Sequence, residues 1–158
     1  MSTRASIAGH PIHPMLVTVP IGLWVFSLIC DFAYVGTDDP RWAVTAYFTL
    51  GGGIVGALIA AVPGLLDLLG LRDPRALRIG TYHLVLNLAI VAVQAWSFWL
   101  RMQEGGYPDV LPRAISIVAI VALAISGWLG GHLVHVLGVT LPHHESAAVG
   151  HDEPHPRT

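Results

Sequence analysis

The feature that most constrains this chain is a series of four apolar segments, each long enough to cross a lipid bilayer. A helix needs about 20 predominantly apolar residues to span a hydrocarbon layer about 30 Å thick. Because backbone polar groups in lipid must be satisfied within the protein, such segments cross as helices. The segments cover about residues 14–35, 42–70, 79–101 and 112–137. We therefore expect an all-α integral membrane protein.

The composition agrees with a membrane location. Hydrophobic residues make up 54% of the 158 residues and charged residues 11%, against about 25% charged residues in soluble domains. The formal net charge is −2, and the sequence has no basic stripe of the kind that binds nucleic acid. We therefore expect a lipid bilayer around the protein and no nucleic-acid partner.

The connections between the segments indicate how the helices are arranged. Residues 36–41, 71–75 and 103–112 are short and contain the Gly and Pro residues that end helices. Short connections make consecutive helices antiparallel, so we expect an integral membrane up-down-up-down four-helix bundle over residues 1–141. Residues 142–158 are rich in His, Pro, Asp and Glu and are predicted to form a disordered tail.

Two pairs of glycines at four-residue spacing predict close contacts between helices. Gly52 and Gly56 lie in the second segment, and Gly127 and Gly131 lie in the fourth. Small residues at this spacing let membrane helices approach closely, although glycine is also common in membrane helices in general. The sequence leaves a homo-oligomer open.

Both termini of such a bundle lie on one side of the membrane, here called side X, and the opposite side is side Y. Arginine is enriched in cytoplasmic connections. Five arginines fall on side X, namely Arg4, Arg72, Arg75, Arg78 and Arg157, and three fall on side Y, namely Arg41, Arg101 and Arg113. This bias predicts that side X, with both termini, is cytoplasmic.

The histidines indicate that the chemically capable side chains gather at side X. His10 and His13 open the first segment, and His83 lies about one turn inside the third. His132 and His135 close the fourth, and four more histidines follow in the tail. An interfacial histidine is often only an amphipathic anchor, which is our interpretation of His135.

One carboxylate belongs to the same layer. Asp67 lies about one turn before the end of the second segment, so at 1.5 Å per residue it should lie at a depth similar to that of His83 and His132. Ionisable groups inside membranes usually face a partner or a cavity. We therefore predict a functional site that includes His13, Asp67, His83 and His132.

The residues before the first segment have their own physical signature. Pro14 suits the first turn of a helix, where its missing N–H is not needed, and Pro11 holds the preceding residues extended. His10 and His13 are therefore presented on a stiff segment, which favours ligation because little conformational entropy remains to be lost.

Four stretches of the sequence resemble one known family. They are residues 9–17 (GHPIHPMLV), 63–67 (PGLLD), 83–87 (HLVLN) and 126–134 (SGWLGGHLV). The chain is similar over about residues 7–140 to the bacterial membrane proteins of domain-of-unknown-function family 2231. The resemblance implies a four-helix protein of the bacterial inner membrane and implies no activity. Many members carry Glu at the position of His132, a replacement that a metal ligand or a proton-linked site tolerates.

Three functions remain open. The first is a small b-type cytochrome that exchanges electrons with a quinone or a protein partner, so that any activity is redox rather than hydrolytic. Haem b would be held by two neutral imidazoles, with His13 and His83 as the favoured axial pair and His83 with His132 as the second choice. Asp67 or the arginines of side X would orient an imidazole or meet the haem propionates.

The second function is a direct site for zinc, copper or iron, because imidazole and carboxylate suit these metals. Its candidate ligands are His10, His13, Asp67, His83 and His132. The third function is a cofactor-free subunit of a larger membrane complex, in which the polar layer pairs with itself or with a partner helix.

Overall fold

The computed structural model describes residues 5–7, 10–107 and 109–138. The predicted tail, residues 142–158, lies outside these residues. The elements are β1 (Ser6–Ile7), β2 (His10–Pro11), α1 (Ile12–Leu16), α2 (Thr18–Thr37), α3 (Pro40–Gly70), α4 (Pro74–Gln103) and α5 (Val110–His135). The two strands form a small antiparallel hairpin in which Ser6 pairs with Pro11 and Ile7 with His10.

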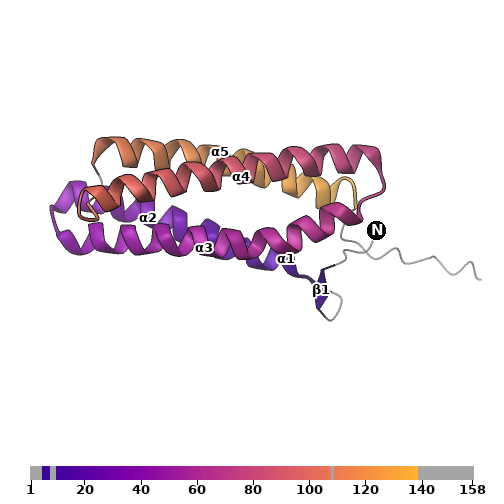
Figure 1. Ribbon diagram of the computed structural model, residues 1–158, viewed down its shortest axis with the longest axis horizontal. Helices are drawn as coiled ribbons and strands as arrows, with labels where there is room; N and C mark the ends of the chain where they lie inside the picture. Colours follow the sequence, from indigo (N-terminus) through magenta and orange to yellow (C-terminus); the bar gives the residue numbers. More distant parts are fainter. Residues whose placement is uncertain (1–4, 8–9, 108, 139–158) are drawn as a thin grey trace, which may run out of the picture.

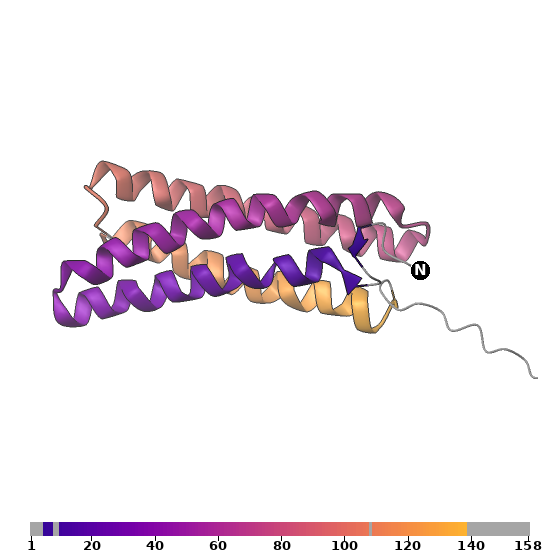
Figure 2. The same cartoon turned by 90° about the horizontal axis from the view of Figure 1, so that it is seen from below.

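Four helical spans are long and apolar enough to cross a membrane, the first being α1 and α2 together. The connections α2–α3 and α4–α5 lie at one end of the bundle, on the left of Figure 1. The connection α3–α4 lies at the opposite end, next to the N-terminal strands, and Figure 2 shows the same arrangement from below. The predicted all-α four-helix bundle is therefore confirmed, with side Y at the left of Figure 1 and side X at the right.

Aspartate caps set the starts of the later helices. The side chain of Asp73 accepts a hydrogen bond from the N–H of Ala76 at 2.9 Å, and Pro74 occupies the first helical position. Both features favour helix initiation at this residue. α4 therefore begins at Pro74 and not at the predicted residue 79. Asp39 and Asp109 similarly precede α3 and α5 and accept backbone N–H bonds.

The first span is interrupted near its start. Val17 separates α1 from α2, three residues before Pro20. Proline has no N–H, so the carbonyl of Leu16 lacks its usual helical donor, and the ring crowds that carbonyl. The short α1 thus carries His13 ahead of this interruption, although the N–H of Val17 still bonds to the carbonyl oxygen of His13 at 3.1 Å.

The bundle core follows a repeating spacing of three and four residues. On α4 the inward residues include Ile90, Gln94, Ser97 and Arg101, all of them at most 3% exposed. This spacing is typical of helices that pack at small angles in bundles. The centre is apolar and consists of Trp24, Leu50, Ile90, Ala119 and Leu123. Large apolar side chains on the outside, such as Phe48 at 70% exposure, suit contact with lipid.

One of the two predicted glycine pairs lies in a helix contact. A Cβ on Gly52 would lie 3.5 Å from Leu23, and one on Gly56 would lie 3.4 Å from Pro20, so this pair packs closely on α2. A Cβ on Gly127 or on Gly131 would have no contact with a neighbouring element within 4 Å. The prediction of a close contact within the chain is wrong for the second pair, because these residues lie beside, and not on, the inward face of α5.

Candidate functional site

His13 on α1 is held by a backbone carbonyl of α3. Its Nδ1 atom lies 2.8 Å from the carbonyl oxygen of Ala60. A carbonyl only accepts hydrogen bonds, so Nδ1 of His13 carries a proton and is the donor. The ring packs directly on Gly64, where a Cβ would lie 2.7 Å from Nδ1. Glycine at this position is therefore what allows His13 to approach α3.

His83 on α4 is held in the same way by α5. Its Nδ1 atom lies 3.0 Å from the carbonyl oxygen of Ser126, which again requires the proton on Nδ1. A Cβ on Gly130 would lie 3.1 Å from the ring. The two histidines are thus held in the same way. Each lies near the start of a membrane span and donates to a backbone carbonyl of the following span. In both cases a glycine four residues after that carbonyl makes room for the ring.

Asn87 fixes the surroundings of His83. Its side-chain Nδ2 donates to the hydroxyl oxygen of Ser126 at 2.6 Å and to the backbone oxygen of His83 at 2.7 Å. These two short bonds use both amide hydrogens. The contact from Nδ2 to Nε2 of His83 is longer, at 3.1 Å. Nε2 of His83 is therefore also within hydrogen-bonding distance of the Asn87 side chain.

The two imidazoles lie close together in an edge-on arrangement. Their ring centres lie 6.3 Å apart, and their planes are almost perpendicular, at 89°. Both rings are partly buried, and in each ring Nδ1 lies within hydrogen-bonding distance of a backbone carbonyl. Histidines that bind metals usually donate from the other ring nitrogen to a carbonyl or carboxylate in this way. The geometry thus brings together two imidazole rings from different helical hairpins.

Asp67 has a different contact from the one expected for a ligand. Its carboxylate oxygen Oδ1 accepts a hydrogen bond from the backbone N–H of Ala5 at 2.9 Å. The backbone oxygen of Ala5 in turn accepts from the N–H of Ile12 at 3.1 Å. Asp67 therefore fastens the N-terminal hairpin, which includes the exposed His10, to the end of α3 on side X.

His132 and His135 lie on the outward side of the last turns of α5. The ring of His132 lies 5.9 Å from that of Trp128. Both histidines, with Trp128, line an open depression of about 290 Å³. Within the described part of the chain, no three His, Cys, Asp or Glu residues gather closely enough to hold a metal ion. The structure thus brings His13 and His83 together and places Asp67 and His132 in other contacts.

The sequence analysis missed a buried ion pair near side Y. Arg101 on α4 donates to both carboxylate oxygens of Asp31 on α2, at 2.6 and 2.7 Å, and both side chains are 0% exposed. Arg101 also donates to the hydroxyl of Ser116 at 3.2 Å. The sequence analysis placed Arg101 on side Y but did not predict that it is buried or that Asp31 is its partner. The spacing of buried residues could have indicated this pair. Asp31 follows Trp24 and Ser27 on α2 at intervals of three and four residues, and Arg101 follows Gln94 and Ser97 on α4 in the same way.

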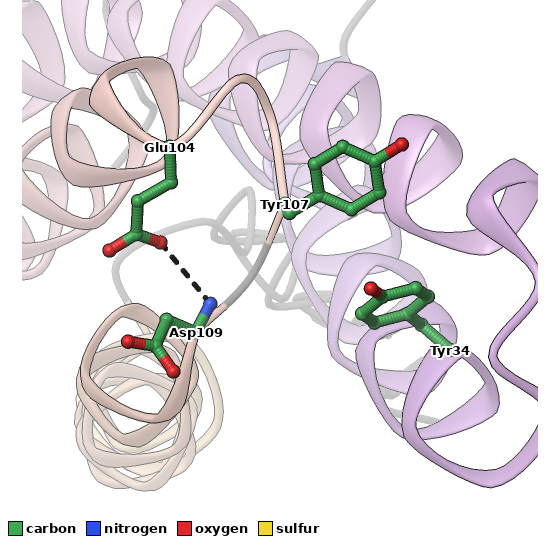
Figure 3. Close-up of a pocket in the computed structure, with 4 residues that line it drawn as sticks. All are labelled: Tyr34, Glu104, Tyr107 and Asp109. Atoms are coloured by element: carbon green, nitrogen blue, oxygen red, sulfur yellow. Dashed lines mark hydrogen bonds between the residues drawn. The ribbon is translucent and has the colours of Figure 1, made fainter.

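A second open depression lies at the same end of the bundle. It has a volume of about 380 Å³ and is lined by Tyr34, Glu104, Tyr107 and Asp109. Figure 3 shows the two tyrosine rings on one side and the two carboxylates on the other, with the backbone N–H of Asp109 donating to Glu104 at 3.3 Å. Glu104, Tyr107 and Asp109 are exposed residues at the α4–α5 connection, whereas Tyr34 is a half-buried residue of α2.

The fold and its apolar spans define a multi-pass helical membrane protein. The chain belongs to the family described as predicted membrane protein (DUF2231), which matches residues 9–142. The matched region contains all four membrane-spanning segments and both His13 and His83. No curated protein and no solved structure matches the chain.

Proposed function

We propose that the protein is a membrane cytochrome of the b type, in which His13 and His83 are the two axial ligands of one haem. The observation that carries this proposal is the close pair of imidazoles, whose ring centres lie 6.3 Å apart and which come from different helical hairpins. Haem takes at most two ligands from the protein, because the porphyrin supplies the other four. Two histidines would therefore be a complete protein contribution for haem, whereas a zinc site takes three or four protein ligands.

The spacing of the rings supports a shared metal. A ring nitrogen lies about 1.1 Å from the imidazole centre and about 2.0–2.1 Å from a metal that it binds, so two imidazoles on opposite sides of one metal have centres about 6.2–6.4 Å apart. The observed separation is 6.3 Å. Gly64 and Gly130 also fit this use, because each keeps a side chain away from a ligand ring.

Residues of the protein would bind the haem and orient its two histidine ligands. The carbonyls of Ala60 and Ser126 accept the Nδ1 protons, which fixes the ring orientation and raises the basicity of Nε2. When bound, haem supplies one-electron redox chemistry. The protein would then exchange electrons with a quinone in the bilayer or with a redox protein on side X.

The same proposal includes a location in the bacterial plasma membrane with side X in the cytoplasm. Arg101 is fully buried in its ion pair with Asp31, so it does not act as a charge of a connecting segment. Without it, the arginine counts by sequence are five on side X and two on side Y. This larger difference favours a cytoplasmic side X.

The test is an optical spectrum of the detergent-purified protein, oxidised and then reduced with dithionite, with metal analysis of the same sample. We expect a Soret band, sharp α and β bands on reduction, and one iron per chain. Zinc, copper or iron without haem bands would contradict the haem and favour a direct metal site. If a sample from fresh membranes contained neither haem nor a bound metal, the remaining function would be that of a cofactor-free subunit of a membrane complex.

Gly64→Ala is expected to lower haem occupancy severalfold. The new Cβ would lie 2.7 Å from Nδ1 of His13, so the ring must move and lose its bond to Ala60. The matched control is Gly127→Ala, because nothing lies within 4 Å of that Cβ. The measurement is the ratio of Soret to protein absorbance. Equal ratios in the two variants would show that the contact with Gly64 does not position a ligand.

A further inference from the structure

Two glycines set the path of the chain where α4 ends. Gly105 and Gly106 have positive φ angles, of 71° and 93°, which residues with a side chain rarely adopt. The N–H of Gly106 donates to the carbonyl oxygen of Arg101 at 2.7 Å, which closes the helix end. Asp109 then accepts the N–H of Val110 at 2.7 Å as the cap of α5. The α4–α5 connection is therefore held by hydrogen bonds at both of its ends.

The same connection brings two tyrosine rings together. The ring of Tyr107 lies 5.8 Å from the ring of Tyr34 on α2, and their planes are tilted by 47°. Parallel stacking would close the space between two rings, whereas this tilt leaves an open angle. A group placed in that angle can lie within about 6 Å of both ring centres, the range in which an aromatic face attracts a cation. The two tyrosines can therefore act as adjoining walls of a cation site.

Two carboxylates complete the lining of this depression, which has a volume of about 380 Å³. Glu104 and Asp109 lie on the side away from the rings (Figure 3). Neither of them forms an ion pair within the part of the chain that the structure describes. Arg101, the nearest arginine along α4, is buried in its pair with Asp31 and does not neutralise them. The depression thus combines two aromatic rings with two carboxylates that have no cationic partner among the described residues.

The place of the depression in the bundle limits what can reach it. Tyr34 lies one turn before α2 ends at Thr37, and the other three residues belong to the α4–α5 connection. Ends of membrane helices lie at the level of the lipid head groups. Quaternary ammonium groups are typically recognised by aromatic rings, and carboxylates add attraction for the positive charge. A cation that carries apolar carbon groups therefore suits this site better than a neutral or an anionic ligand.

We propose that this depression is a binding site for an alkylammonium group, with Tyr34 and Tyr107 as its walls and Glu104 and Asp109 as its counter-charges. Its volume lies within the range of about 300–1,000 Å³ that small-molecule sites occupy. A choline-type lipid head group and a free quaternary amine on side Y carry the same chemistry. The site lies at the opposite end of the bundle from His13 and His83, so it does not depend on the proposed function.

The test measures choline binding to the whole protein in dodecyl maltoside, an uncharged detergent, by a ligand-observed NMR titration. The matched ligand is 3,3-dimethyl-1-butanol, which has the shape of choline with carbon in place of the charged nitrogen. We expect choline to bind about fivefold more tightly or better, because each exposed ring contributes about a two- to fivefold gain for a cation. Equal affinities of the two ligands would overturn the proposal.

Variants then assign the binding to this depression. Tyr107→Leu is expected to weaken choline binding about two- to fivefold, and Glu104→Gln is expected to weaken it while keeping the side-chain shape. The matched control is Asp38→Asn, which removes an exposed acid at the same end of the bundle that does not line the depression. Wild-type affinity in both Tyr107→Leu and Glu104→Gln, or an equal loss in Asp38→Asn, would refute the assignment.

A competition experiment distinguishes the two sources of the ligand. Soluble short-chain phosphatidylcholine is added against bound choline, with phosphatidylglycerol of the same chain length as the control. Displacement at a lower concentration than choline itself requires would identify a lipid head group as the ligand. Weaker displacement would identify a free amine. Displacement by phosphatidylglycerol to the same extent would show that acyl chains occupy the site, which would contradict an ammonium site.

Discussion

His83→Ala is expected to leave the protein inserted in the membrane but without its haem, with at least a tenfold loss of Soret absorbance per chain. The variant removes one of two imidazoles whose ring centres lie 6.3 Å apart. The proposed haem would lose one of its two protein ligands, together with the carbonyl of Ser126 that orients that ligand. His13→Ala should have the same effect, because the two ligands are equivalent in the structure.

The control for this prediction is His132→Ala. His132 is also an imidazole near side X, but its ring contacts Trp128 on the outward face of α5. Its replacement should keep the spectrum of the wild type. Added imidazole should partly restore the spectrum of His83→Ala, which separates a lost ligand from a misfolded protein. A wild-type spectrum in His83→Ala or His13→Ala would refute the assignment.

Arg101→Met is expected to lower the free energy of unfolding by about 3–5 kcal/mol, because it leaves Asp31 as an unpaired buried charge. Both side chains are 0% exposed and are joined by two hydrogen bonds of 2.6 and 2.7 Å. The double variant Asp31→Leu/Arg101→Met should recover most of this loss, since an apolar pair of similar volume is often as stable as a buried ion pair.

The measurement is reversible unfolding in detergent for both single variants and the double variant, analysed as a double-mutant cycle. The matched control is Arg41→Met, which removes an arginine from its pair with Asp39. That arginine is 89% exposed, so little change is expected. If Arg101→Met and Arg41→Met behaved alike, the buried pair would not contribute to stability.

The sequence predicted the fold well because the bilayer sets the length and polarity of every span. The spans end close to the predicted residues, and the difference at α4 comes from a local cap by Asp73. The juxtaposition of His13 and His83 was also predicted, from their positions near helix starts on the same side. Their haem-binding role stays a prediction, because depth along a helix indicates which residues can meet and not what they bind.

Other features depend on which face of a helix points inward, and depth alone does not specify this. In the sequence, Asp31 is a single acidic residue inside an apolar span. Arg101 lies near the end of its span, so by position it would be placed at the membrane interface on side Y. Only the rotation of α2 and α4 in the bundle brings them together. Rotation also decides that Gly64 and Gly130, and not Gly127 and Gly131, make room for neighbouring side chains.

The long sequence separation of each histidine from its carbonyl acceptor has a consequence for biosynthesis. His13 and Ala60 are 47 residues apart, and His83 and Ser126 are 43 residues apart. A nascent chain therefore cannot fix the tautomer of either imidazole until the second helix of its own hairpin has entered the bilayer. Since the two rings belong to different hairpins, the histidine pair with both ring orientations fixed exists only after translation of α5. In the proposed cytochrome, haem insertion would then be a late, post-translational step.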